Sequence, residues 1–446
     1  MWAIEGDAVW AETATGLAGR GRSNSFMQGA RALATRPGGI YGYDKMIGES
    51  YRDYTPDYYV FGYLMMNHLR KLDSIAWNRT FGDVLCRIPL NPVNRGLKRE
   101  TGLTKKKLYD STFSLLEKRW KEADNKGFTE YTPLNVKRKR DYVNHYSPHR
   151  TEDGSIVSLR TSLSAPSRFV ITDKESGKEN VLTTTGYIYP YVFSFAGSTL
   201  VWSEIHPDIR WGNRDYSVIK KMNVQDGAVQ QLTRGTRFAA PDLSPDERTV
   251  VAVSTTPELR CSLVFIDAET GEVLMDVVPP DNLILQRPAW SSDGKAVTVV
   301  TLNNAGEGIR TYRPTGKRWT TDMPEGPTDI IQAEIFNDTL FYLAQGDGSD
   351  NIYRITDDTV ITRVTDSRYG ISGFSIKGNE IMFSDYTAGG FVIASEHSSA
   401  GTGLPSGSMH GVIPETAPWP SKLSAPVQRD YKLPESTPYR KFSHLF

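Results

Sequence analysis

The chain is poor in cysteine, has no long apolar run and carries no net charge. Its 446 residues include two cysteines, Cys86 and Cys261, which are too few for a disulfide framework or a cysteine-rich zinc site. We expect both to be small buried apolar residues. No run of about 18 apolar residues occurs, so no transmembrane helix is expected. Because Lys+Arg and Asp+Glu each total 52, charge favours neither nucleic acid nor an anionic membrane as a partner.

A secretion signal and a zinc-peptidase motif are also missing. Residues 1–5 include neither a basic start nor an apolar core, so no signal peptide is expected in this chain. None of the seven histidines belongs to a His-Glu-x-x-His sequence, the helical motif that holds catalytic zinc. The chain is nevertheless long enough for two or more domains, and its 39% of hydrophobic residues can form their cores.

A repeated pattern organises the middle of the chain. Residues 240–254 and 288–300 each contain a proline, an apolar or aromatic residue, Ser-x-Asp and then alternating apolar positions. This pattern predicts a β-hairpin with a tight turn. Apolar anchor residues ahead of such turns recur at intervals of about 40 to 50 residues, the length of a propeller repeat. The six anchors are Tyr146, Val192, Leu243, Trp290, Ile335 and Phe374.

A second hairpin follows the first in the clearest units, as in residues 264–277 and 352–365. Two hairpins per unit predict a four-stranded blade. A stack of unrelated sandwich hairpins would also give short strands with turns, but it would not require a fixed period. The favoured fold class is therefore multidomain α plus all-β, with an N-terminal helical domain followed by a six-bladed β-propeller.

The Ser-Pro-Asp turn after a proline and an apolar residue resembles the TolB-like, WD40-like propeller repeat. The match is good in units three and four and degraded in the others. Six units favour the TolB-like family over the seven-bladed WD40 family, and no Gly-His…Trp-Asp signature is present. No Asp/His cluster recurs at equivalent blade positions, so a propeller with its own catalytic metal has little support.

Residues 1–125 carry helical patterns and no β repeat. Helices are expected over residues 58–70, 77–85 and 104–120, and Thr104 can cap the last of them. The core-facing stripe of that helix should consist of Leu108, Phe113, Leu116 and Trp120.

The opening of the chain resembles the gluzincin metallopeptidases, in which Trp-x-x-Glu-Gly-x-Ala-x-x-x-Glu follows the His-Glu-x-x-His helix. The residues that match are Trp2, Glu5, Gly6, Ala8 and Glu12. The resemblance implies that Glu5 is the third zinc ligand, a role suited to a carboxylate beside two histidines. Residues 59–62 resemble the family's Tyr-x-x-Gly, which implies that Tyr59 stabilises the oxyanion of the tetrahedral intermediate. The alternatives are an exposed first-turn carboxylate for Glu5 and a half-buried aromatic for Tyr59.

This chain lacks part of the gluzincin pattern that catalysis requires. Two histidine ligands and the general-base glutamate have no counterpart in this chain, and one carboxylate cannot hold a catalytic metal. We therefore expect no cofactor here, and zinc only if upstream ligands are supplied. The chain by itself should bind no stoichiometric zinc and cleave no peptide.

Three domains are expected: a gluzincin-like helical subdomain at 1–128, the propeller at 129–397 and a tail at 398–446. The tail is rich in Gly, Ser and Pro and is expected to be a linker or an irregular cover. Its ending, residues 439–446, resembles the segment leading into an outer-membrane barrel in long Bacteroidota proteins that carry a peptidase-like domain and a propeller. That resemblance implies a periplasmic or cell-envelope location and an outer-membrane association through a further downstream region.

Two functions of different classes follow. The favoured one is a protein- or peptide-binding or scaffolding propeller, since propellers present variable loops on a rigid ring. The other is the downstream part of a zinc metallopeptidase whose propeller gates or recruits substrate. A long loop in unit two is the candidate binding segment, with a solvated loop containing two packing tryptophans as the alternative. Its candidate residues are Trp202, Glu204, His206, Asp208, Arg210 and Trp211.

Two structural expectations complete the picture. The unit starting at Phe374 supplies only three strands, so residues 132–143 should add a fourth and close the ring. Blade-to-blade packing covers both faces of each sheet, so Val250, Ala252, Val297 and Val299 should lie on one face and their neighbours, such as Val251, on the other, all of them buried.

Overall fold

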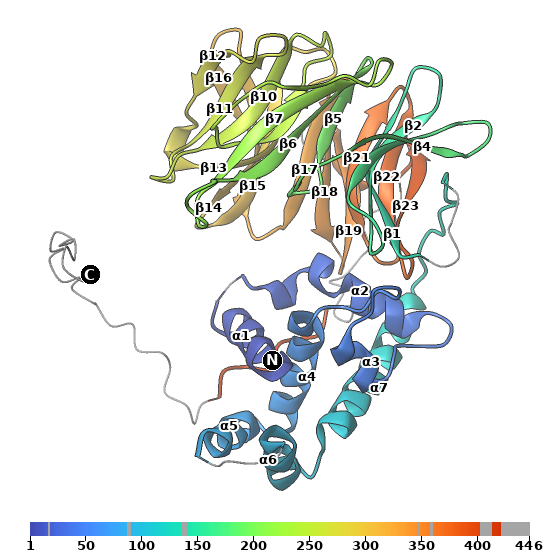
Figure 1. Ribbon diagram of the computed structural model, residues 1–446, viewed down its shortest axis with the longest axis vertical. Coiled ribbons are helices and arrows are strands. Elements are labelled where there is room, and N and C mark those ends of the chain that lie inside the picture. Colours follow the sequence, from blue (N-terminus) through green and yellow to red (C-terminus); the bar gives the residue numbers. More distant parts are fainter. Residues whose placement is uncertain are drawn as a thin grey trace, which may run out of the picture.

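The structure is a computed structural model that describes residues 1–16, 18–86, 91–135, 141–346, 348–356, 360–401 and 413–420. Seven α-helices in the described residues precede the β-strands, and the helical domain lies at one end of the β domain (Figure 1). In this part of the chain no helix combines the length and the apolar character needed to cross a membrane.

The helices lie where the sequence predicts them. Asp57 caps α4 by accepting hydrogen bonds from the backbone N–H groups of Tyr59 and Val60, and Thr104 caps α7 by accepting from that of Lys107. The expected core stripe of α7 is buried throughout. The helices are α1 (Trp2–Thr15), α2 (Asn24–Thr35), α3 (Tyr43–Gly48), α4 (Tyr58–Leu72), α5 (Ala76–Cys86), α6 (Pro92–Thr101) and α7 (Lys105–Asp124), with a 3₁₀ turn at Arg20–Arg22.

The strands form six antiparallel sheets, each made of consecutive strands. Blade 1 is β1 (Val143–Arg150), β2 (Ile156–Ser162), β3 (Arg168–Thr172) and β4 (Glu179–Thr184); blade 2 is β5 (Phe193–Ala196), β6 (Thr199–Pro207), β7 (Asp215–Asn223) and β8 (Val229–Gln231). Blade 3 is β9 (Phe238–Leu243), β10 (Thr249–Thr255), β11 (Cys261–Asp267) and β12 (Val273–Val277); blade 4 is β13 (Ile284–Trp290), β14 (Val297–Asn303), β15 (Gly306–Arg313) and β16 (Arg318–Gly326). Blade 5 is β17 (Ile330–Phe336), β18 (Thr339–Gly346), β19 (Ser349–Thr356) and β20 (Val360–Arg363); blade 6 is β21 (Ile371–Lys377), β22 (Glu380–Thr387) and β23 (Gly390–His397). The β domain is a six-bladed propeller.

The blades pack through both faces of their sheets, as predicted. Val250 and Ala252 of β10 pack on blade 2, and Val251 on the same strand packs on Val297 and Val299 of blade 4. All five side chains are fully buried. Cys261 is also buried and unpaired, as expected, whereas the side chain of Cys86 lies outside what the structure describes.

The prediction of a fourth strand in blade 6 is wrong for the described part of residues 132–143. Val143 begins β1 and pairs within blade 1, and residues 132–135 form no strand. Leu134 and Asn135 nevertheless lie along β23, because the Leu134 N–H donates to the Ile393 carbonyl at 2.8 Å and the Asn135 side chain accepts from the Ile393 N–H at 2.9 Å. A side chain therefore satisfies an edge group that a strand would otherwise pair. Residues 136–140 lie outside the described part.

The ring is closed by direct contacts between blades 1 and 6. The Arg150 guanidinium forms an ion pair with Glu380 at 2.6 Å, and the Ser375 hydroxyl donates to the Pro148 carbonyl at 2.6 Å. The Phe391 N–H donates to the Asn144 side chain at 3.0 Å. Polar contacts of this kind, together with packing of β1 on blade 6, replace a shared strand.

A short stretch of the tail, residues 413–420, returns to the helical domain (Figure 1, red). The Asn67 side chain holds its backbone at two points, donating to the Glu415 carbonyl and accepting from the Ala417 N–H. Trp419 stacks on Trp10 with ring centroids 5.3 Å apart. This stretch is the irregular cover expected of the tail, while residues 402–412 and 421–446, with the ending that resembles a barrel lead-in, lie outside the described part.

Candidate functional site in the central channel

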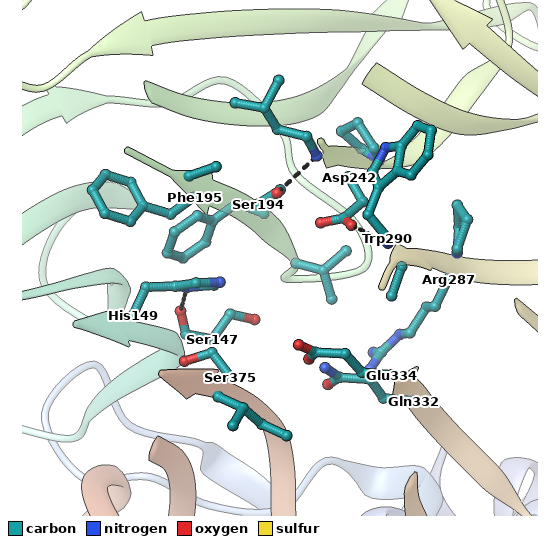
Figure 2. Close-up of a pocket in the computed structure, with 18 of the residues that line it drawn as sticks. Ser147, His149, Ser194, Phe195, Asp242, Arg287, Trp290, Gln332, Glu334 and Ser375 are labelled. Carbon is teal, nitrogen blue, oxygen red and sulfur yellow. Dashed lines mark hydrogen bonds between the residues drawn. The ribbon is translucent and has the colours of Figure 1, made fainter. Parts of the chain in front are cut away.

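A cavity of about 340 Å³ lies at the centre of the propeller. The innermost strands of all six blades line it, together with first-hairpin turn residues such as Pro245 and Ser292. The helical domain contacts the other end of the ring, where Asn24 of α2 donates to Asp350 in blade 5 at 3.0 Å. The cavity therefore opens on the face away from the helices. Its main polar lining residues are Ser147, His149, Ser194, Asp242, Arg287, Gln332, Glu334 and Ser375 (Figure 2).

Three of the inner strands carry the same local distortion. The backbone φ angle is positive at Ser147 (48°), Ala240 (48°) and Arg287 (44°), and each of these residues precedes a proline. The strand register shifts at all three places, which marks a β-bulge. Bulges bend a strand and re-aim the residues that follow, and an inner edge tolerates proline because its N–H is not needed there. The bulges lead directly into His149, Asp242 and Ala289, which line the cavity.

Asp242 is a carboxyl group held in a fixed position. Its Oδ2 accepts from the backbone N–H of Trp290 at 2.6 Å. The Ser194 hydroxyl accepts from the Leu243 N–H at 2.9 Å and acts on Asp242 as a hydrogen-bond partner. Burial raises the pKa of Asp242 to about 6, and these hydrogen bonds oppose that rise. The group is therefore mostly ionised near neutral pH.

Glu334 lies on the opposite side of the open space (Figure 2). Burial, and then the charge of Asp242, raises the pKa of Glu334 to about 8. Within the described residues no hydrogen bond to its carboxyl group is found. At neutral pH Glu334 therefore holds a proton and has an unused polar group in the channel.

Arg287 supplies the positive charge of the lining. Burial lowers the pKa of Arg287 to about 10, and Tyr189 and Glu307 act in the opposite direction, so it stays cationic at neutral pH. Its Nη1 and the Nε1 of Trp290 are buried without hydrogen-bond partners among the described residues. Burial also lowers the pKa of His149 to about 4, so this imidazole is neutral. The lining thus combines a cationic guanidinium, a neutral imidazole and the unpaired carboxyl group of Glu334.

The protonation of Glu334 makes a prediction about stability. A carboxyl group whose pKa is raised from 4.5 to about 8 on folding stabilises the fold below pH 4.5, and that contribution is lost as the pH rises through 8. Glu334→Gln removes this loss, so its melting temperature should exceed that of the wild type more at about pH 9 than at about pH 5. The change should be on the order of 2 kcal/mol, less than the full shift because the channel admits water. Parallel pH profiles of the two melting temperatures would contradict the raised pKa.

The residues predicted to form a binding loop in unit two are placed differently. Trp202, Glu204 and His206 lie in strand β6, and only residues 208–214 connect it to β7. Trp202 is 1% exposed and Glu204 is 3% exposed, so the prediction that they belong to a binding loop is wrong. The prediction placed this segment in a loop, whereas Thr199–Pro207 is strand β6. Leu200 and Trp202 alternate along this strand and pack against blade 1.

Trp202 and Glu204, the buried pair in β6, form polar contacts within blade 2. The Trp202 indole N–H donates to Glu204 at 2.8 Å, and the Lys220 ammonium pairs with the same carboxylate at 2.8 Å. Burial acts to raise the pKa of Glu204, but hydrogen bonds from Lys220 and Trp202 hold it below its usual value. His206 lies 3.5 Å from Glu204 at the strand end.

The remaining three residues do lie in the connection. The Asp208 carboxylate accepts from the backbone N–H groups of Arg210 and Trp211, which fixes the turn. Trp211 is 57% exposed, and the Arg210 guanidinium lies 5.1 Å from its ring centroid. Of the predicted set, Arg210 and Trp211 are exposed and the His206 side chain is 39% exposed, and none of the three lines the channel.

Glu5 and Tyr59 are brought together although they are far apart in sequence. Helices α1 and α4 cross at Gly6 and Gly62, where a Cβ on Gly6 would lie 2.2 Å from the Gly62 carbonyl carbon. A hydrogen bond with Tyr58 and then the charge of Glu5 raise the pKa of Tyr59. The Arg20 guanidinium lies 5.1 Å from the Tyr59 ring and pairs with Glu12 at 2.8 Å. In the described residues, no group of three or more His, Cys, Asp or Glu side chains could hold a metal ion.

The channel residues Asp242, Arg287 and Glu334 were not identified from the sequence. The repeat register could have indicated Asp242 and Glu334, because each immediately precedes an anchor residue, Leu243 or Ile335, as Ala289 precedes Trp290. Successive side chains of a strand point in opposite directions, so the residue before a blade-facing anchor points away from that blade. In the innermost strand of a propeller that direction can lead into the channel.

No protein-family model and no curated protein matches this chain. Solved structures do match it. TolB is among them. TolB from Acinetobacter baumannii has 12% sequence identity and a TM-score of 0.38 over 67% of this chain and 72% of that chain.

The other similar structures include chains of peptidases. The propeller domain of the Trilobed protease from Pyrococcus furiosus has 13% identity and a TM-score of 0.40 over 59% of this chain and 98% of that chain. A prolyl endopeptidase has 14% identity and a TM-score of 0.39, covering 67% of this chain and 50% of its own length. At these identities and TM-scores the similarities carry no argument about the function of this chain.

Proposed function

We propose that this chain is a peptide- or protein-binding propeller whose ligand enters the central channel. The supporting observation is the cavity of about 340 Å³, whose polar lining includes the carboxyl group of Glu334, which has no hydrogen-bond partner in the described residues. Buried polar groups are normally hydrogen-bonded, and those left unpaired at a cavity are suited to a ligand that pairs them. Peptides supply both donors and acceptors along their backbone.

The binding test uses a library of random tetrapeptides incubated with the full chain, followed by mass spectrometry of the retained peptides. Ala289→Trp places a large side chain in the channel and should abolish retention. The matched control combines Arg210→Ala with Trp211→Ala at the exposed β6–β7 connection and should leave retention unchanged. Loss of retention in the control alone would move the site to the connection, and no retention by the wild type would contradict peptide binding.

A second function is supported by the meeting of Glu5 and Tyr59 across the Gly6–Gly62 crossing. We propose that the helical domain is the C-terminal part of a gluzincin-like domain, so that Glu5 would be the third zinc ligand and Tyr59 the oxyanion stabiliser. A raised pKa keeps the Tyr59 hydroxyl protonated, as a hydrogen-bond donor must be. With the two histidine ligands supplied from elsewhere, the propeller would gate or recruit substrate, in the periplasm or cell envelope as the resemblance to Bacteroidota proteins implies.

Metal analysis of the purified chain in added zinc, with a peptide-hydrolysis assay, tests this second proposal. We expect neither stoichiometric zinc nor hydrolysis, because a catalytic zinc needs three protein ligands and an open position. One zinc per chain that Glu5→Ala removes would show that this chain already holds a complete site.

A further inference from the structure

We infer that the space between Asp242 and Glu334 is a subsite for the ammonium group of a peptide ligand. This inference rests on the proposed peptide-binding function and adds the chemistry of the recognised group. Asp242 comes from β9 in blade 3 and Glu334 from β17 in blade 5, and between them β13 of blade 4 presents the small side chain of Ala289 to the cavity. The two carboxyl groups face the open space together (Figure 2).

The two carboxyl groups differ in how firmly they are held. Asp242 is oriented by the Trp290 N–H at 2.6 Å and by Ser194, whose hydroxyl oxygen is itself fixed by the Leu243 N–H. Glu334 has no such partner among the described residues. One acceptor is thus preorganised and the other is free to close on a ligand, which suits a group with several donors.

The charges around the pair favour a cation. Asp242 is mostly ionised near neutral pH, Glu334 holds a proton, and His149 across the channel is neutral. Arg287 is the positive group of the lining, and the acidic group that acts on it is Glu307, which is not a lining residue of this cavity. An anion would meet the charge of Asp242, whereas a cation would pair with both carboxylates.

Ammonium fits better than a metal ion. Within the described residues the region offers no third His, Cys, Asp or Glu ligand, and hard divalent cations need more oxygen ligands than two carboxyl groups supply. On binding, the protonated Glu334 carboxyl releases its proton to solvent, and the ammonium group donates N–H bonds to both carboxylates in its place.

Isothermal titration with defined peptides tests the subsite. The probes are tetra-alanine amide with a free amino terminus, its N-acetylated form, and an N-acetylated tetrapeptide amide containing one lysine. Acetylation of the alanine peptide should weaken binding at least tenfold. Titration at pH 7 in two buffers of different ionisation enthalpy should show release of about one proton on binding. Recovery of affinity by the lysine peptide would assign the side chain as well as the terminus as a source of the ammonium group.

Variants separate the subsite from general peptide binding. Glu334→Gln should abolish the proton release, and Asp242→Asn should reduce affinity for the free-amine peptide while hardly changing affinity for the acetylated one. Glu272→Gln, at an exposed carboxylate outside the channel lining, should behave as the wild type. Equal binding of the free and acetylated alanine peptides would overturn the ammonium subsite and leave peptide binding standing. Absence of binding by all three peptides would overturn both.

Discussion

Gly6→Ala should destabilise the helical domain by about 3 kcal/mol, because the added methyl group has no space at the crossing of α1 and α4. A Cβ at residue 6 would lie 2.2 Å from the Gly62 carbonyl carbon, 2.3 Å from its oxygen and 2.7 Å from the Tyr63 nitrogen. These are backbone atoms of a helix and cannot rotate aside. The helices would have to separate, which would also move Glu5 away from Tyr59.

Denaturant unfolding measures this effect, with Gly82→Ala as the matched control. Gly82 lies in α5, and a Cβ there would meet nothing within 4 Å. Alanine favours a helix over glycine by about 1 kcal/mol, so the control should be stabilised. Similar unfolding midpoints for the two variants would show that the crossing is looser than described here.

Trp202→Ala should cost about 4 kcal/mol, since a large buried aromatic side chain is replaced by a cavity. Trp202 packs edge-to-face against Phe169 of blade 1 with ring centroids 5.0 Å apart. Its indole N–H also satisfies one oxygen of Glu204, which is nearly fully buried. The substitution therefore removes apolar contacts between blades 1 and 2 and leaves a buried acceptor with one fewer donor.

Trp211→Ala is the control for this second prediction. The same residue type is exposed there, in the β6–β7 connection, so the cost should stay within about 0.5 kcal/mol. Thermal and denaturant unfolding of both variants provide the comparison. Equal destabilisation by the two substitutions would contradict the placement of Trp202 in the core and of Trp211 on the surface.

The propeller repeat could be predicted from the sequence because it depends on interactions within single hairpins. The Ser-Pro-Asp turn of residues 244–246 appears in the structure as predicted, with the Ser244 hydroxyl donating to Asp246 at 2.6 Å. Alternation in β10 places Val250 and Val251 on opposite faces, and burial of both follows from blade packing. Turn residues and period-two patterns act within one hairpin, so a single sequence carries them.

The sequence did not predict which residues of the candidate binding loop are exposed. Trp202 and Trp211 are the same residue type in one segment, yet one lies in the core and the other in solvent. The deciding factor is the neighbouring blade, whose Phe169 meets Trp202. Burial against another part of the chain is not a local property, so an aromatic in a strand and one in a loop look alike in sequence.

The sequence by itself determined the helical start, the six units and the three strands of the last one, because these follow from hairpin turns, helix caps and apolar periodicity. Only the tertiary structure decided the rest. It brings Glu5 to Tyr59 through two glycines and closes the ring through Asn135, Arg150 and Asn144 rather than through a strand. It also gathers Asp242, Arg287 and Glu334 from three blades around one cavity. The physical reason is that the pKa of a carboxyl group and the free space beside it depend on what surrounds the group in three dimensions, and residues from distant units supply those surroundings.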